Sequence, residues 1–290
     1  MSDRPFGRSL VRLGALALGR ARAHRQDIWP YLAIDRPSGR VAWKGAPLAR
    51  LSPFAAVVPA GAPFLAIVGS GPSLAAQRVE HLPRGTAILL NGAASLAGRV
   101  APLAVAVEDE RFVFRHAAML AKLPGGLPLF LSPAAMRALA ERHPALLDTR
   151  PLCLIDDLRK PVNAPRRLLS DPALDGVLRR DGAAALSRVP DAGVVIAGTV
   201  AFSALQIALA ANPGEILLAG TDLSNAAEPR FYETAGDTAP SGLERGRGRI
   251  LESFALARDE ARDRGIRLAC ASPVSALLGL GIPRDARLDA

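Results

Sequence analysis

The sequence predicts an α/β protein built on a Rossmann-like, mostly parallel sheet with helices on both faces, preceded by a basic N-terminal extension. Short runs that are apolar at successive positions recur along the chain, which is typical of strands buried on both faces. Segments with helical spacing alternate with these runs. Half of the 290 residues are hydrophobic and 22% are charged, which fits a globular chain that buries a sizeable core.

Residues 1–60 form the predicted extension. A helix is expected over about residues 8–25, where leucines and arginines are interspersed, and a hairpin over residues 34–43, around a Pro-Ser-Gly turn. Residues 1–50 hold ten Arg or Lys against three Asp, a net charge of +7 out of the chain's +9. The basic charge is therefore concentrated in the extension.

Residues 61–290 form the predicted Rossmann-like domain, in which strands and helices alternate; the motifs and the resemblance described below imply that this domain binds a nucleotide sugar. The expected strands are residues 64–68, 86–90, 103–107, 127–131, 152–155, 215–219 and 266–270. The expected helices are residues 74–79, 111–122, 133–142, 199–211 and 248–264, followed by a last short helix. The Arg- and Pro-rich segment 157–193 interrupts this order and is interpreted as a lid or an inserted helical segment.

Small or polar residues follow the predicted strands, at Gly69–Ser73, Asn91-Gly92, Glu108–Glu110, Gly220–Asp222 and Ala271–Pro273. In open parallel sheets, ligands bind at the carboxyl ends of strands, near the point where the strand order reverses. This composition is what a nucleotide site needs at such an edge.

The sequence Gly69-Ser70-Gly71-Pro72-Ser73 follows the first strand and opens a helix. Glycines allow close approach of a phosphate, and a helix start offers free N–H groups to an anion. Pro72 suits a first helical turn, and Ser70 or Ser73 could cap the helix or contact phosphate. The segment is neither a P-loop nor the dinucleotide fingerprint, and a tight turn without a ligand is the alternative interpretation.

The acidic residues that follow two of the predicted strands each have two interpretations. Glu108-Asp109-Glu110 could hold a divalent metal on a diphosphate, but a helix N-terminus stabilised by negative charge is favoured. Asp222 could orient a ribose or an acceptor hydroxyl, or cap the next turn. The four histidines lack metal-ligand spacing, and Cys153 and Cys270 fall inside predicted strands, so neither a metal centre nor a disulfide is expected.

The basic N-terminal segment also bears on partners. Residues 1–30 could form an amphipathic helix lying on an anionic membrane, or a solvated helix packed by its leucines. Aromatic residues are 4% of the chain and no recognition helix is visible, so nucleic-acid binding is not expected. No membrane span or signal-peptide pattern is visible, which predicts a cytoplasmic protein, at most peripheral to the inner face of the cell membrane.

Five motifs in this order resemble the bacterial sialyltransferases of glycosyltransferase family 42, which use CMP-sialic acid. They also resemble the related 6-hydroxymethyl-dihydropterin pyrophosphokinase-like and motility-associated glycosyltransferase group. The resemblance spans about residues 64–282 and implies a GT-A-like variant of the fold. The motifs are AIVGSGPSL from Ala66, Asn91, Gly198-Thr199 with the following Ala-rich helix, EILLAGTD from Glu215 and IRLACASPVS from Ile266.

The resemblance implies a set of nucleotide-binding residues. They are Gly69, Ser70, Gly71, Pro72, Ser73, Asn91, Asp109, Gly198, Thr199, Asp222 and Ser272. Ser70 and Asp109 stand where the family has asparagines, and Val195 stands where it has an arginine. Two family tyrosines that hold the leaving phosphate correspond to Ser224 and Tyr232.

The family's general-base histidine has no counterpart, because residues 223–250 contain no His. A base in this loop would be Glu233, Asp237 or Glu244, so Tyr232, Glu233 and Glu244 are the predicted catalytic residues. Arg245, Arg247 and Arg249 could neutralise phosphate, or form a solvated basic face.

These expectations combine into a glycosyltransferase that moves a sugar from a nucleotide donor, expected to be CMP-linked, onto a cell-surface glycan or lipopolysaccharide precursor. The reaction would displace the nucleotide directly at the anomeric carbon, without a resident cofactor or a required metal. Two alternatives stay open. One is a pterin pyrophosphokinase-like enzyme that uses ATP and Mg²⁺, and the other is a non-catalytic nucleotide- or glycan-binding protein.

Overall fold

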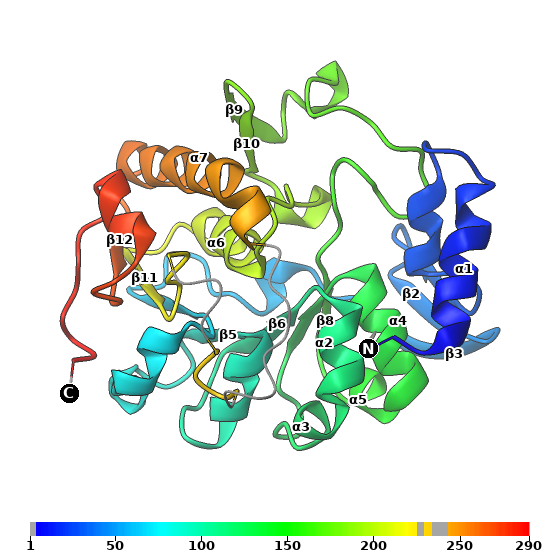
Figure 1. The fold of residues 1–290 in the computed structure, drawn as a ribbon, viewed down its shortest axis with the longest axis horizontal. Coiled ribbons are helices and arrows are strands. Elements are labelled where there is room, and N and C mark those ends of the chain that lie inside the picture. The colour runs from blue at the N-terminus through cyan, green and yellow to red at the C-terminus, as the bar shows by residue number, and fades with distance from the viewer. Residues whose placement is uncertain (1–3, 225–228, 234–242, 290) are drawn as a thin grey trace.

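A seven-stranded, all-parallel sheet forms the centre of the molecule (Figure 1). The computed structural model describes residues 4–224, 229–233 and 243–289, with the backbone alone for 243–245. The strands are β4 (Leu65–Val68), β5 (Ala87–Leu90), β6 (Ala104–Val107), β7 (Leu129–Leu131), β8 (Leu152–Leu154), β11 (Glu215–Ala219) and β12 (Arg267–Cys270). Their spatial order is β12-β11-β4-β5-β6-β7-β8, and every neighbouring pair is parallel. The predicted fold class is confirmed.

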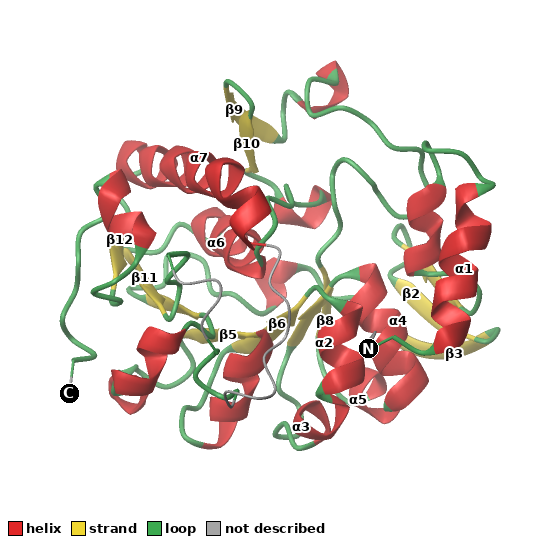
Figure 2. Ribbon diagram, in the orientation of Figure 1, coloured by secondary structure: helices red, strands yellow, loops and turns green. Residues whose placement is uncertain are grey.

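Helices cover both faces of this sheet (Figure 2). The α-helices α6 (Val200–Ala210) and α7 (Leu243–Asp263) lie on one face, and α2 (Glu110–Arg115), α3 (Ala117–Ala121), α4 (Pro133–Arg142) and α5 (Ala145–Asp148) lie on the other. Along β4, Leu65 and Ile67 join the core under α6 and α7, while Ala66 and Val68 join the opposite core. The strands are apolar at every position because both of their faces are buried.

Short 3-10 helices fill several connections. They are η1 (Ala23–Asp27), η2 (Phe54–Ala56), η3 (Pro72–Ala76), η4 (Val79–His81), η5 (Asn91–Gly98), η6 (Pro172–Leu174), η7 (Pro190–Ala192) and η8 (Ala276–Leu280). The glycine-rich segment therefore opens a 3-10 turn rather than the expected α-helix. The expected helix over 111–122 is divided into α2 and α3 at His116, whose ψ of 26° is not helical. Helix α7 begins five residues before the expected residue 248.

The N-terminal extension differs from the sequence prediction. Its helix α1 covers only Phe6–Leu16, and Gly19, at a φ of 72°, turns the chain soon after it. The expected hairpin is a three-stranded antiparallel sheet of β1 (Leu32–Asp35), β2 (Arg40–Trp43) and β3 (Ala46–Arg50). Lys44 and Gly45 both have positive φ and reverse the chain between β2 and β3. The pattern gave no alternation of apolar residues over 46–50, so the third strand was not predicted.

Segment 157–193 holds an antiparallel ribbon, β9 (Leu178–Asp181) and β10 (Ala184–Ser187), and no α-helix among its described residues. Arg179 and Arg188 each place a guanidinium nitrogen 2.8 Å from Oε2 of the buried Glu260 on α7. The ribbon is thereby fastened to α7. The only helices described in the segment are the short 3-10 helices η6 and η7, and the lid interpretation stays a prediction.

The order of the strands fixes where a site can form. From β4 the chain builds the sheet outward to β8, and it then returns to add β11 on the opposite side of β4. The carboxyl ends of β4 and β11 therefore lie at the topological switch point, where ligands bind in folds of this kind. Five of the seven strands, all but β7 and β8, are followed by a segment that the sequence analysis singled out for its polar or small side chains.

Candidate functional site

The glycine-rich loop after β4 lies directly against the end of β11. The N–H of Gly69 donates to the carbonyl of Ala219 at 2.7 Å, and the N–H of Gly71 donates to the carbonyl of Gly220 at 2.8 Å. A Cβ on Gly69 would lie 2.4 Å from the oxygen of Gly220, and one on Gly71 would lie 2.5 Å from Oδ2 of Asp222. Both glycines are required because two stretches of chain meet here.

Asp222 fastens this loop. Its Oδ2 accepts the N–H of Ser73 at 2.9 Å, and its Oδ1 accepts the hydroxyl of Ser73 at 2.5 Å. The carboxylate is buried, with 3% of its residue exposed. Of the two interpretations of Asp222, the structure supports a cap, and it caps the start of η3 across the loop rather than its own next turn. Ser73 and Asp222 are thus engaged with one another.

Asn91 and Gly92 lie at the end of β5, where the chain turns into η5. Asn91 has a φ of 45°, and its Oδ1 is buried without a hydrogen-bond partner among the described residues. A buried amide oxygen without a partner is unfavourable, so this atom is suited to accept from a ligand donor. A Cβ on Gly92 would lie 1.7 Å from Cε1 of Tyr232, so the missing side chain makes room for the tyrosine ring.

The ring of Tyr232 lies against Gly92 and contacts two other aromatic rings. Its ring centroid lies 5.5 Å from that of His116 and 5.4 Å from that of Phe231, both edge-on. Burial raises the pKa of the Tyr232 phenol above its ordinary value of 10.0, with Arg230 opposing the shift. The hydroxyl therefore stays protonated at neutral pH and is a hydrogen-bond donor. The structure brings together Tyr232 and the Asn91 turn, which are far apart in the sequence.

Glu108, at the end of β6, is the residue that the sequence analysis did not single out for catalysis. Its Oε1 is buried and has no hydrogen-bond partner among the described residues. Burial raises the pKa of Glu108 from 4.5 to about 7; the carboxylates of Asp157 and Asp109 add to the rise and the Ser203 hydroxyl opposes it. The sequence signal was available, because Glu108 is the first polar residue after a buried strand.

The other two acids of the triplet have structural roles. Asp109 is the N-cap of α2: its side chain accepts the N–H of Arg111 at 2.9 Å and forms an ion pair with the Arg111 guanidinium. Glu110 lies in the first turn of α2 and is bound by arginines of α1 and the residues before it. The favoured helix N-terminus interpretation is confirmed for Asp109. Across the described ranges, no three His, Cys, Asp or Glu side chains are grouped to hold a metal.

The start of α6 supplies the opposite wall of the same sheet edge. Thr199 is the N-cap, and its hydroxyl accepts the N–H of Ala201 at 3.3 Å. Gly198, at a φ of 116°, lies beside Arg249 of α7, whose Nε donates to the carbonyl of Ala197 at 2.9 Å. The Arg249 guanidinium thus lies next to the turn that precedes α6. Ser272, by contrast, is fully buried after β12.

The other residues that the sequence analysis named in the loop before α7 are described only in part. Glu233 is bound by Arg230, which places a guanidinium nitrogen 2.7 Å from its Oε1 and donates its backbone N–H to Oε2 at 3.1 Å. Glu244 lies in the first turn of α7, but its side chain is outside the described residues, as is that of Arg245. Asp237 also lies outside the described residues. Ser224, which is described, donates its hydroxyl to the carbonyl of Val274.

No protein-family model matches the chain, and no curated protein matches its sequence significantly. Among solved structures, the chain is similar to the sialyltransferase CstII from Campylobacter jejuni, in complex with the substrate analogue CMP-3FNeuAc. The identity is 15%, the match covers 79% of this chain and 88% of that one, and the TM-score is 0.42. A likeness this remote leaves the function to be inferred from the chain's own residues.

Proposed function

We propose that this chain is a glycosyltransferase that moves a sugar from a nucleotide-activated donor, CMP-linked, onto a cell-surface glycan or lipopolysaccharide precursor. The observation that carries the proposal is the buried, unpartnered Oδ1 of Asn91 at the switch-point edge, with the ring of Tyr232 over the adjoining Gly92. An acceptor atom and a phenolic donor at neighbouring positions suit a nucleoside and its phosphate. The family resemblance of the motifs supplies the donor class.

The donor would be held by groups that face this edge. Oδ1 of Asn91 would accept from an amine or hydroxyl of the nucleoside, which gives that oxygen the partner it lacks. The neutral phenol of Tyr232 would donate to the phosphate. The guanidinium of Arg249, next to Gly198, would offset the negative charge that develops on the leaving phosphate. Such neutralisation requires no resident metal.

Glu108 is the general base of the proposed reaction. Its carboxylate accepts the proton of the acceptor hydroxyl as the oxygen attacks the anomeric carbon. The new glycosidic C–O bond forms while the bond from that carbon to the phosphate oxygen breaks. The nucleoside monophosphate leaves with the electron pair of the broken bond. A base works best when its pKa lies near the working pH, and burial raises the pKa of Glu108 to about 7. Glu233 is bound by Arg230 and is less available for this task.

Nucleotide binding is the first test, measured as thermal stabilisation by CMP, CDP, UDP, GDP and ATP, each with and without Mg²⁺. A ligand at 100 times its Kd stabilises the native state by about 2.7 kcal/mol. We expect stabilisation by CMP without metal. Stabilisation by ATP with Mg²⁺ alone would support the pyrophosphokinase alternative instead, and the absence of any shift would overturn nucleotide binding.

Two pairs of variants make this test specific. Gly92→Ala puts a methyl group where the Tyr232 ring lies, whereas Gly98→Ala, in the same η5, meets no atom within 4 Å. Asn91→Gly removes the amide that follows β5, and glycine tolerates the positive φ at this position. Thr86→Ala changes the residue that precedes β5, at the other end of the strand. We expect CMP binding to weaken roughly tenfold or more in Gly92→Ala and Asn91→Gly, and to stay unchanged in the two controls.

A further inference from the structure

Helix α1 presents its basic face to the protein and its apolar face to the outside. Arg8 is buried, with 2% of the residue exposed, and its guanidinium bonds Oε2 of Glu110 at 2.9 and 3.1 Å. The same guanidinium donates to the carbonyls of Trp29 and Gln26. Arg4 contacts the other oxygen of Glu110 at 2.5 Å. These contacts fix the rotation of α1 about its axis.

The opposite face of α1 is an exposed apolar stripe. Phe6 is 79% exposed, Leu10 55% and Leu13 65%, and these residues are four and three positions apart, on one face of the helix. Leu16 and Leu18 extend the stripe beyond them. An amphipathic helix ordinarily turns its apolar side inward, and contiguous exposed apolar surface marks an interaction site. We call these five residues the α1 stripe.

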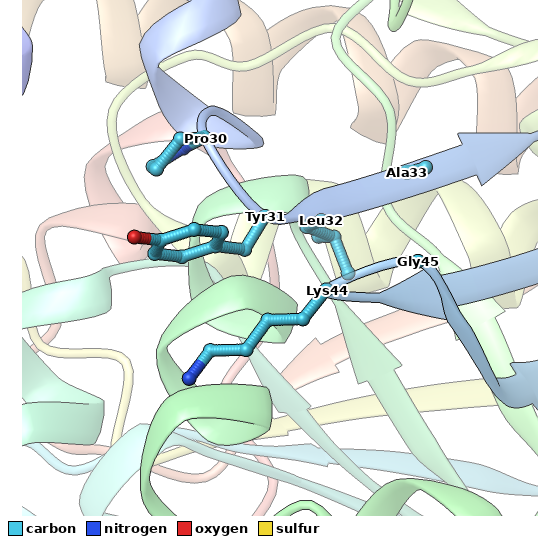
Figure 3. A pocket seen from close by; sticks show the side chains of 6 residues that line it. All are labelled: Pro30, Tyr31, Leu32, Ala33, Lys44 and Gly45. Carbon is cyan, nitrogen blue, oxygen red and sulfur yellow. The ribbon is translucent and has the colours of Figure 1, made fainter.

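Exposed basic and aromatic residues follow the α1 stripe along the chain. Arg20 and Arg22, in the segment after α1, are exposed, as are Trp29 and Tyr31, which come after η1, the 3-10 helix packed beside α1. The amine of Lys44 lies 5.4 Å from the centre of the Tyr31 ring. Figure 3 shows these two side chains next to one another among the residues that line a pocket of about 530 Å³. Apolar side chains that occur together with arginine, tryptophan and tyrosine are typical of surfaces that lie at the lipid–water interface.

We propose that the α1 stripe docks on the surface of an anionic lipid bilayer. The charge next to the stripe decides between this occupant and a second copy of the chain. Two copies paired through the stripe would bring Arg20 and Arg22, which follow Leu18 closely, near their own counterparts, which repel. Anionic headgroups attract the same cations, and the headgroup boundary accepts the apolar side chains. Of the helices that the structure describes, none combines the length and the hydrophobicity needed to cross a bilayer, so the contact is interfacial.

The placement of α1 relates the membrane to the candidate site. Glu110, which holds Arg4 and Arg8, opens α2 only two residues after Glu108 at the sheet edge. A bilayer under α1 would therefore be rigidly positioned relative to that edge, as suits an acceptor carried by a lipid. Docking of α1 does not require the proposed glycosyl transfer, so either can fail without the other.

Vesicle co-sedimentation of the full chain tests this docking. We expect binding to phosphatidylcholine vesicles that contain phosphatidylglycerol, weaker binding at high salt, and much weaker binding to phosphatidylcholine alone. Phe6→Ser with Leu10→Ser and Leu13→Ser should weaken binding roughly tenfold or more. Val189→Ser with Val274→Ser is the control, because these residues are also exposed but belong to other parts of the fold. Binding that is equal in the α1 variant and the control would overturn the proposal.

Two further measurements distinguish the occupants. In a Trp43→Phe background, Trp29 is the single tryptophan, and its emission should shift to the blue when anionic vesicles are added. Analytical ultracentrifugation without lipid should give a monomer for both the parent and the α1 variant. A concentration-dependent dimer that the α1 variant loses would show that a second copy covers the stripe, and would overturn membrane docking.

Discussion

Glu108 and Glu110 stand two residues apart at one end of one strand, yet their carboxylates have different surroundings. Glu110 meets the arginines Arg4, Arg8 and Arg12, at 2.5, 2.9 and 3.8 Å. Glu108 has a buried oxygen without a hydrogen-bond partner among the described residues, and a pKa raised to about 7. A buried carboxylate paired with arginines keeps its charge, and breaking the pair is costly, whereas a carboxylate whose pKa is raised by burial is poised to take a proton.

The largest expected effect comes from removing the carboxylate of Glu108. If Glu108 is the base, Glu108→Gln lowers kcat by about 10² to 10⁴ and leaves CMP binding unchanged. The rate of the parent enzyme should rise with pH through about 7, because a base acts in its deprotonated form. Steady-state kinetics with a CMP-sugar donor checks this. An unchanged kcat in Glu108→Gln together with a lowered kcat in Glu233→Gln would show that Glu233, and not Glu108, is the general base.

The same substitution should raise stability above neutral pH. The folded-state pKa of Glu108 is above its ordinary value of 4.5, so between these values the native state holds a proton that the unfolded chain has released. Stability of the parent therefore falls as pH rises from about 4.5 to 7, and glutamine avoids that loss. We expect Glu108→Gln to be more stable by up to about 3 kcal/mol at pH 8, measured by denaturant unfolding.

The next effect comes from the paired carboxylate. Glu110→Gln leaves the buried guanidinium of Arg8 without its counter-ion, and breaking a buried pair in this way costs about 3–5 kcal/mol of unfolding free energy. Glu80→Gln is the matched control, because the Glu80–Arg99 pair is largely exposed and should contribute less than about 1 kcal/mol. Equal urea midpoints for the two variants would show that the Glu110 cluster does not hold α1 in place.

The smallest effect is expected at Arg12, where a substitution should change the free energy of unfolding less than one at Arg8. The Arg12 side chain is 42% exposed and lies 3.8 Å from Glu110, so Arg12→Met should change the free energy of unfolding by less than about 1 kcal/mol. Arg8→Met, at the buried member, also deprives two backbone carbonyls of a donor and should cost several times more. The measurement is again denaturant unfolding, and similar losses in both variants would contradict the assignment of Arg8 as the principal contact.

The strand ends illustrate how far sequence reasoning could go. The pattern located Gly69–Ser73, Asn91 and Asp222 at the correct edge, because each follows a run of buried residues. It left Asp222 open between a ligand role and a cap, since nothing local indicates that its partner is Ser73, on another strand's loop. It passed over Glu108 as a base because the acids of the triplet look equivalent in the sequence.

By itself, the sequence determined the layers and the seven strands of the central sheet, because hydrophobic periodicity and turn residues act over a few neighbouring positions. Only the tertiary structure decided which carboxylate is paired, since Arg8 reaches Glu110 across more than one hundred residues. It likewise placed Tyr232 over Gly92 and turned the apolar face of α1 outward. Burial and pairing depend on elements that meet only when the chain is folded, and these two quantities separate a structural acid from a reactive one.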